Sequence, residues 1–345
     1  MDIRTGYPFR GKALKELRGF LAQNGLAYDE RITYSLCLIE NDEIVASGSL
    51  DGGILKCIAV SRDVQERGLA ARIVSGLIDE AARNSVFHLF LFTKPENEAL
   101  FSGLSFYTIT KTNDALLMEN KKNGVAAFVA ALEKPDVLRG LRGLRGLPGA
   151  DTGMTTGAIV MNCNPFTLGH QYLAERAAAE CGCLHIFVVS EEKSVFPAEH
   201  RLRLARAGTA HIKNALVHPS GPYLISAATF PDYFIKDRIR AEQINALLDL
   251  KIFAECFASP LGITRRFVGE EPMDPITGAY NRQMKESLPS WGIEVREIQR
   301  LEQEGTPVSA SRVRELLTQG RLQEAGKLVP LTTWEYLRKR YGGEI

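Results

Sequence analysis

The 345-residue sequence lacks several features that would place it in a specialised class. It has no excess of either charge, because 42 lysine and arginine residues balance 41 aspartate and glutamate residues. This balance gives no electrostatic support for a nucleic-acid or anionic-membrane partner. No apolar run approaches the roughly 18 residues that cross a bilayer, and the N-terminal segment MDIRTGYPFR lacks the apolar core of a signal peptide. We therefore expect a cytoplasmic protein with a small or protein-borne substrate.

Cysteine is scattered along the chain. Only Cys181 and Cys183 of the six cysteines form a close pair, with no second pair or histidine cluster at metal-ligand spacing. We expect reduced thiols in apolar segments and no metal site made of protein ligands. Hydrophobic residues make up 45% of the chain, which is enough for packed cores. Because the chain is longer than a single-core domain usually is, we expect two domains.

The first 120 residues predict antiparallel strands followed by a helix. Three apolar segments, YSLCLIE, EIVASGSL and ILKCIAV, are separated by turn residues at Asn41-Asp42 and Gly52-Gly53. A helical pattern, ARIVSGLIDEAARN, comes next, and then a strand, VFHLFLF, and a helix from about Asn97. This order predicts an α+β domain over residues 1–134.

A tether is predicted over residues 135–155. The stretch LRGLRGLRGLPGADTG repeats a three-residue unit rich in arginine and glycine, has neither a helix nor a strand period, and ends in turn residues. The alternative is that its three arginines bind phosphate. A second domain is then expected over residues 156–345.

In this second domain, strands and helices alternate. The apolar segments GAIVMN, HIFVVS, YLISAATF, RRFVG and EVREI are separated by helical patterns over 167–181, 198–211, 238–257 and near 281. Alternation of this kind predicts a parallel sheet that helices cover on both faces. Ligands of such sheets bind beyond the carboxyl ends of the strands.

The segment NCNPFTLGH lies at one of these carboxyl ends. Thr167 can cap the following helix, and the unpaired N–H groups of the first turn suit a phosphate. We expect Pro165 to stiffen the approach, Gly169 to let a bulky anion reach the backbone, and His170 to point a ring N–H at the anion. The alternative is a capped helix with an incidental histidine.

A second helix start occurs at TPVSASRVR. Serine is available as its cap, and Ser311 and Arg314 lie three residues apart on one helix face. A helix start, a hydroxyl and a guanidinium fork together can hold a polyphosphate. An ordinary capped surface helix is the alternative.

The two helix starts resemble the signatures of the nucleotidylyltransferase superfamily, (H/T)-x-G-H and I-S-S-T-x-x-R. The resemblance implies that His170 steadies the α-phosphate, that Ser311 and Arg314 hold the β- and γ-phosphates, and that Lys193 also reaches the phosphates. Ala310 and Ser311 depart from the family's serine and threonine, so one hydroxyl is lost. The implied catalytic residues are Thr167, His170, Lys193 and Arg314, and the implied nucleotide-binding residues are Asn164, Pro165, Phe166, Gly169, Gly269, Glu270, Ser309 and Ser311.

In the first domain, the motif Gln65-x-x-Gly68-x-Ala70 is similar to the pyrophosphate loop of the GNAT acetyltransferases. Backbone N–H groups of this loop, which includes Arg67, would grip the diphosphate of coenzyme A. An ordinary strand-to-helix turn is the alternative. GNAT enzymes often carry Tyr-x-x-x-Gly-Phe, but Phe101 stands at the tyrosine position, and phenylalanine cannot donate a proton. Our hypothesis is that this domain binds a CoA-like group without acetylating amines.

Taken together, the chain resembles the citrate lyase ligase family. The segments HLFLFTKPEN, ISAATFPDYFIKD, VGEEPMDPITGAYN and LVPLTTWEYL extend the likeness over nearly the whole chain. The resemblance implies a GNAT-like α+β domain followed by a Rossmann-like parallel α/β domain. It also implies ATP- and Mg²⁺-dependent acetylation, through acetyl-AMP with release of AMP and pyrophosphate, of a thiol on citrate lyase. That thiol belongs to a dephospho-CoA-derived prosthetic group on the acyl carrier subunit.

The acetate site and the reaction itself leave alternatives open. We expect acetate near the small residues after YLIS, with core packing as the alternative role for these residues; the candidates are Ser226, Ala227, Ala228, Thr229, Tyr233 and Lys236. One rival function is a plain nucleotidylyltransferase that acts on a phosphopantetheine-like acceptor. The other is a non-catalytic CoA- and nucleotide-binding protein.

Overall fold

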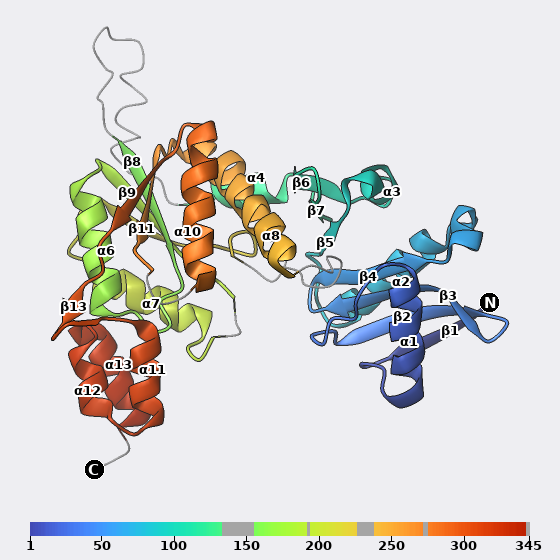
Figure 1. The fold of residues 1–345 in the computed structure, drawn as a ribbon, viewed down its shortest axis with the longest axis horizontal. Helices are drawn as coiled ribbons and strands as arrows, with labels where there is room; N and C mark the ends of the chain where they lie inside the picture. The colour runs from blue at the N-terminus through green and yellow to red at the C-terminus, as the bar shows by residue number, and fades with distance from the viewer. Residues whose placement is uncertain (133–154, 192–193, 226–237, 272–274, 343–345) are drawn as a thin grey trace, which may run out of the picture. The chain divides into compact units, whose positions relative to one another are not determined.

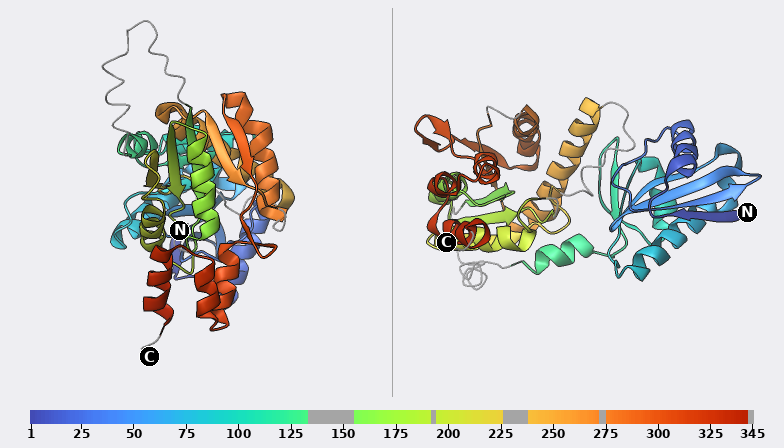
Figure 2. Two further views of the ribbon diagram at one scale, coloured as in Figure 1. Left: turned by 90° about the vertical axis from the view of Figure 1, so that its left-hand side faces the viewer. Right: turned by 90° about the horizontal axis from the view of Figure 1, so that it is seen from below.

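The computed structural model describes residues 1–132, 155–191, 194–225, 238–271 and 275–342 (Figures 1 and 2). Contacts between Cα atoms divide the chain into a first unit, residues 1–127 and 227–252, and a second unit, residues 128–226 and 253–345. The domain boundaries expected from the sequence stay predictions, and residues 135–154 of the expected tether lie outside the described residues. Within these described ranges, no helix is both long and apolar enough to span a bilayer.

The first unit is built on a mixed seven-stranded sheet with the order β1-β2-β3-β4-β5-β7-β6. Strands β1 to β4 form an antiparallel meander, whereas β4 and β5 run parallel and pair only at Ile54–Phe90 and Leu55–Leu91. Beyond these two pairs, β4 and β5 no longer pair. The strands are β1 (Asp2–Gly6), β2 (Tyr34–Glu40), β3 (Glu43–Asp51), β4 (Ile54–Val60), β5 (Phe90–Thr93), β6 (Tyr107–Lys111) and β7 (Leu116–Glu119).

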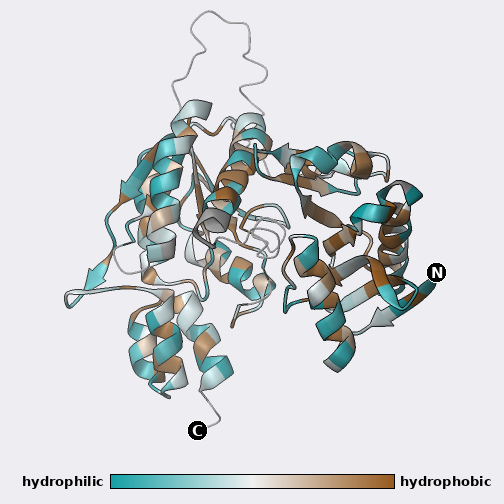
Figure 3. Cartoon of the chain, turned by 45° about the vertical axis from the view of Figure 1, so that its right-hand side comes forward, coloured by the Kyte–Doolittle hydropathy of each residue, from teal (hydrophilic) through white to brown (hydrophobic). Residues whose placement is uncertain are grey.

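Helices α1 and α2 cover opposite faces of this sheet. Side chains alternate along a strand, so Leu36 of β2 packs in the cluster of α2, and the adjacent Cys37 packs in the cluster of α1. Figure 3 shows hydrophobic residues gathered along the strands of this unit. The helices are α1 (Gly11–Gln23), η1 (Arg62–Arg67), α2 (Leu69–Arg83), η2 (Pro95–Asn97), α3 (Glu98–Ser102), α4 (Gly124–Ala130), which spans the boundary between the units, and α8 (Arg238–Ile252).

The second unit contains a parallel five-stranded sheet with the order β10-β9-β8-β11-β12. The chain starts in the middle at β8, proceeds outward to β10, and then returns to the other side of β8. The order therefore reverses between β8 and β11, and ligands of doubly wound sheets bind at this switch point. The strands are β8 (Thr156–Met161), β9 (Cys183–Val188), β10 (Ala215–Pro219), β11 (Arg265–Gly269) and β12 (Glu294–Ile298).

Helical segments pack on both faces of this sheet. On one face, α6 and α7 pack through small and branched residues against Ile159 and Ile186. On the other face, the ring of Phe257 in the π-helix η3 meets Phe187 edge-on at 5.5 Å. The helices are α6 (Leu168–Ala179), α7 (Ala198–Gly208), η3 (Phe253–Ala258), α9 (Ser259–Leu261), α10 (Pro275–Ser287) and η4 (Leu288–Trp291).

A small helical cluster completes the second unit. Its apolar core joins Val313, Leu316 and Leu337 to Phe196, which precedes α7. A hairpin of β13 (Glu302–Gln303) and β14 (Thr306–Pro307) leads into the cluster, whose helices are α11 (Ala310–Thr318), α12 (Leu322–Lys327) and α13 (Leu331–Tyr341). Figure 1 shows these three helices packed together near the C-terminus.

The α/β fold class and the parallel sheet expected from the sequence are confirmed. Two strand predictions are wrong in detail. VFHLFLF forms a strand only over Phe90–Thr93, and strand β10, the segment ALVHP, was not expected. The strand expected in YLISAATF would begin at Tyr223, but residues 223–225 form a turn and bends. The rest of that segment lies outside the described residues.

Candidate active site

The first helix tip of the site is the start of α6, which follows strand β8 after a short loop. Thr167 is the N-cap, and its side chain accepts a hydrogen bond from the backbone N–H of His170. The His170 ring nitrogen Nδ1 in turn accepts from the backbone N–H of Thr167 at 3.0 Å. This reciprocal capping box fixes both side chains. An N-cap of this kind stabilises a helix by about 1 kcal/mol.

The capping box also fixes the tautomer of His170. Because Nδ1 accepts from the backbone of Thr167, the proton of the neutral ring lies on Nε2. Burial, with a smaller contribution from the charge of Arg300, lowers the pKa of His170 to about 4. At pH 7 the ring is therefore neutral and offers a single N–H donor.

The second helix tip is the start of α11. Ser309 is the N-cap, and its hydroxyl accepts from the backbone N–H of Arg312 at 3.1 Å. One turn later, the Nη2 group of Arg314 donates to the Ser311 hydroxyl at 3.0 Å. The expected pairing of Ser311 and Arg314 on one helix face is therefore present.

Arg314 links the two helix tips directly. Its Nη1 group donates to the backbone carbonyl of Asn164 at 2.5 Å, although the two residues are 150 positions apart. The tips also touch at Gly169, where an added Cβ atom would lie 2.7 Å from the carbonyl oxygen of Val308. Glycine is therefore needed at position 169 because the backbone of Val308 approaches it closely. The sequence alone had instead suggested the approach of an anion at this glycine.

Both helix tips open into one cavity of about 960 Å³. It lies at the carboxyl ends of β8 and β11, where the strand order reverses, and its volume suits a nucleotide. The sequence-predicted residues that line it are Asn164, Thr167, Gly169, His170, Gly269, Ser309, Ser311 and Arg314. Pro165, Phe166 and Glu270 are not among the described lining residues, and Phe166 is fully buried in the core.

Some of the predicted site residues lie outside the described residues. Lys193 belongs to the gap at 192–193, and the acetate candidates from Ser226 to Lys236 belong to the gap at 226–237. Their roles stay predictions.

Arg201 of α7 holds the loops around the cavity. Its side chain is fully buried and donates to carbonyl oxygens of Asn162, at 2.8 Å, and of Val189, at 2.5 Å. It also donates to the carbonyl oxygens of Glu191 and Phe196. These segments follow β8 and β9, so one guanidinium ties together two strand ends at the site. Arg201 is therefore placed to hold both loops in position.

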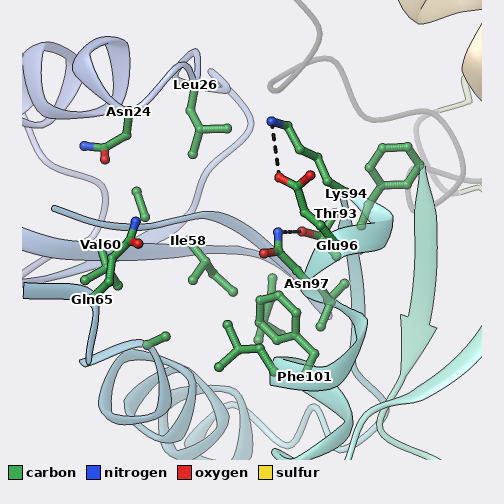
Figure 4. A pocket seen from close by; sticks show the side chains of 16 residues that line it. Asn24, Leu26, Ile58, Val60, Gln65, Thr93, Lys94, Glu96, Asn97 and Phe101 are labelled. Carbon is green, nitrogen blue, oxygen red and sulfur yellow. Dashed lines mark hydrogen bonds and ion pairs between the residues drawn. The ribbon is translucent and has the colours of Figure 1, made fainter. Parts of the chain in front are cut away.

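A separate pocket of about 390 Å³ lies in the first unit. Its walls come from β4 and β5 beyond their last paired residues, and they include Ile58, Val60 and Thr93 (Figure 4). Two residues of the predicted pyrophosphate loop, Gln65 and Ala70, also line it. The pocket is therefore placed where the sequence predicted the binding of a CoA-like group.

Other residues of this loop behave differently. Gly68 is the N-cap of α2. Its φ of 69° lies in the left-handed region, which favours glycine. Arg67 forms a two-pronged pair with Glu40 at 2.8 and 2.9 Å and is not a lining residue in the described pocket. Phe101 lines the pocket with 3% of its surface exposed, and Figure 4 places its ring there. The pocket thus has a phenyl ring where GNAT enzymes often have a tyrosine.

Comparisons with known proteins decide the family. A family model described as "Citrate lyase ligase C-terminal domain" matches residues 156–337. The [Citrate [pro-3S]-lyase] ligase of Escherichia coli (strain K12) is 39% identical over 95% of this chain and 91% of its own length. The chain belongs to the citrate lyase ligase family. The [Citrate [pro-3S]-lyase] ligase of Klebsiella pneumoniae, another member of this family, is 40% identical over 92% of this chain and 90% of its own length.

The similar solved structures share little sequence with this citrate lyase ligase family member. A Thermotoga maritima TmcAL bound with alpha-thio ATP has 13% identity and a TM-score of 0.40, over 55% of this chain and 56% of its own. An acyl-CoA N-acyltransferase from Pseudomonas aeruginosa has 13% identity and a TM-score of 0.31, over 35% of this chain and 100% of its own.

Proposed function

We propose that the chain is an ATP-dependent acid–thiol ligase that acetylates the thiol of the citrate lyase prosthetic group. The substrate thiol is carried by the acyl carrier subunit on a dephospho-CoA-derived arm. The family membership supports this overall reaction. The reaction proceeds in two steps, through acetyl-AMP, and a cytoplasmic location fits these substrates.

The observation that carries the proposal is the bridge from Arg314 to Asn164. It joins the phosphate-binding helix start of α11 to the loop before α6, and both open into one cavity. Two helix N-termini with N–H donors, the neutral His170 ring and the Arg314 guanidinium therefore converge on one ligand. This set of donors suits the triphosphate of ATP.

The first step needs placement and charge relief but no general base. Acetate is already ionised at pH 7, since carboxylic acids titrate near pH 4. One carboxylate oxygen forms a bond to the α-phosphorus, the bond from that phosphorus to the bridging oxygen breaks, and pyrophosphate departs with the electron pair. The Nε2–H of His170 stabilises the charge that develops on the α-phosphate oxygens.

The second step transfers the acetyl group. The prosthetic-group thiolate attacks the acetyl carbonyl carbon, the bond to the AMP oxygen breaks, and the thiol proton goes to solvent. We propose that the pocket of the first unit binds the CoA-like arm that bears this thiol. The pocket offers apolar contact area on β4 and β5, and Phe101, which has no hydroxyl, favours holding the arm over proton transfer.

Mg²⁺ would enter with the nucleotide. Among the described residues there is no group of three or more histidine, cysteine or acidic residues that could hold a metal ion. The cavity instead supplies N–H donors and cationic side chains, which fits a Mg²⁺ ion coordinated mainly by the phosphates. Such an ion would neutralise charge on the phosphates when bound.

The test is an ATP–pyrophosphate exchange assay with a panel of short carboxylic acids, with and without deacetylated citrate lyase. We expect exchange that depends on acetate and needs no lyase, and AMP formation that needs the lyase. Exchange that ignores the acid, or a dinucleotide-like product formed from phosphopantetheine without any acid, contradicts the proposal and favours the plain nucleotidylyltransferase.

A further inference from the structure

Arg300 is a cationic residue of the adenylation cavity to which the family signatures assign no role. It follows β12 and lines the same cavity as His170, Ser311 and Arg314. Its Nε group donates to the carbonyl oxygen of Glu270 at 2.6 Å, and its Nη2 group contacts the carboxylate of Glu271. The Arg300 side chain keeps 27% of its surface exposed and that of Glu271 keeps 11%. The guanidinium is thus fixed by two neighbours at the end of β11.

The remaining N–H groups of Arg300 have no assigned task. Its Nη1 group makes no hydrogen bond to any described residue, so this end of the guanidinium can still donate. The charge of Arg300 also acts on His170, because it adds to the lowering of the pKa of that ring. A guanidinium charge and the Nε2–H donor of His170 therefore act on the same part of the cavity.

The two arginines of the cavity are anchored differently. Arg314 is tied to Asn164 and Ser311 at the helix tips, where the triphosphate is expected. Arg300 is tied to the ends of the strands, through Glu270 and Glu271. The reaction has two anionic partners, a triphosphate and a carboxylate, and a cation beside each of them lowers their mutual repulsion.

We propose that Arg300 binds the carboxylate of the acid substrate beside the α-phosphate, and that Glu271 positions Arg300 for this task. The proposal rests on the proposed function. A guanidinium donates to a carboxylate with matched, fork-shaped geometry, whereas the two contacts to Glu270 and Glu271 stop its rotation. The acid is then held by its charge next to the phosphorus that it attacks.

The experiment compares Arg300→Gln with wild type in acid-dependent ATP–pyrophosphate exchange. We expect the KM for acetate to rise about 10- to 100-fold, as loss of a charge-assisted hydrogen bond predicts. The affinity for ATP, measured without acid by calorimetry, should change less than about threefold, because the helix tips and Arg314 remain. Arg321→Gln is the matched control, since Arg321 pairs with Glu324 outside the cavity.

Two further variants separate binding from a merely structural role. Arg300→Ala should regain acetate affinity when guanidinium ion is added, because the ion can replace the missing group. Glu271→Gln should raise the acetate KM by a smaller factor than Arg300→Gln. A rise confined to the ATP dissociation constant would make Arg300 a phosphate ligand and overturn the proposal, and so would an unchanged acetate KM. Absence of acid-dependent exchange in the wild type would instead refute the proposed function itself.

Discussion

The two cavities described above differ in what their walls offer a ligand. The cavity of the second unit is lined by helix N-termini, a neutral histidine and arginines that hydrogen bonds hold in place. The pocket of the first unit combines apolar side chains of β4 and β5 with polar residues such as Gln65, Lys94 and Asn97, and Phe101 stands where a proton donor is expected. The fixed donors at the starts of α6 and α11 therefore belong to the cavity of the second unit.

Activation and carriage of the acyl group therefore have separate requirements. Adenylation stabilises charge on phosphate and needs fixed donors. Holding a flexible arm needs apolar contact area and backbone hydrogen bonds and no acid or base. A change in one cavity should therefore affect one half-reaction and leave the other intact.

The largest effect is expected at His170. His170→Ala removes the Nε2–H donor, so we expect acetate-dependent ATP–pyrophosphate exchange to fall about 100- to 1,000-fold. His211→Ala is the matched control, because His211 pairs with Glu175 on the surface. Circular dichroism should show an intact fold in both variants. Near-normal exchange by His170→Ala would refute the assignment of this ring.

The contact between the two helix tips is tested at Gly169. A Cβ atom there would lie 2.7 Å from the Val308 carbonyl oxygen, so Gly169→Ala must push the tips apart. Small misplacements of this kind reduce rates strongly, and we expect about a 10- to 100-fold loss of exchange. Gly19→Ala, in α1 with nothing within 4 Å of the new atom, is the control. Full activity of Gly169→Ala would mean that the tips need not interlock.

The first unit is tested by filling its pocket. Ile58→Trp places a large ring among the lining residues shown in Figure 4. We expect the KM for deacetylated citrate lyase to rise about tenfold, as loss of roughly 1.4 kcal/mol of binding implies, while ATP–pyrophosphate exchange stays normal. Ile58→Val is the conservative control. Loss of exchange together with thiol acetylation would contradict the separation of the two roles.

The pH dependence of stability should differ between the units. Burial lowers the pKa of His170 and His185 to about 4 and that of His218, which also faces His185, to about 3. A lowered histidine pKa contributes stability that is present above the unfolded value near 6.5 and is lost as pH falls toward 4. From pH 7 to pH 5 the second unit should lose about 1–2 kcal/mol per histidine.

The stability of the first unit should change less over the same pH range. Burial of Asp29 is outweighed by hydrogen bonds from Arg31 and Lys56, which hold the pKa of Asp29 well below its usual range. That stability is lost only as pH falls below about 4. Both tryptophans, Trp291 and Trp334, belong to the second unit, so fluorescence follows that unit and hydrogen exchange follows the first. Equal losses in both units between pH 7 and pH 5 would contradict this assignment.

Much of the fold could be predicted because its signals are local. Hydrophobic periodicity located β2, β3, β4, α2 and the central strands of the second unit. The cap at Thr167 and a serine cap before α11 were predicted from residue type alone, since a hydroxyl before a helical pattern satisfies an orphan N–H. Strand β10 was missed because ALVHP is short and ends in proline, which gives a weak strand signal.

The parts of the site that escaped prediction depend on contacts between distant segments. Arg201 and Arg300 carry no motif, and their roles follow from the carbonyl and carboxylate groups that the fold brings to them. The reason for glycine at position 169 likewise depends on Val308, which is far away in sequence. Sequence patterns report local conformation, whereas the interlocking of two motifs is a tertiary property.

The central claim is that a bare carboxylate attacks the α-phosphorus of an ATP held between the two helix tips. It is tested most directly with acetate labelled by oxygen-18 in both carboxylate oxygens, in a reaction with ATP and deacetylated citrate lyase. We expect one labelled oxygen in each AMP molecule, detected by mass spectrometry, and none in pyrophosphate. Unlabelled AMP, or label in pyrophosphate, would contradict it.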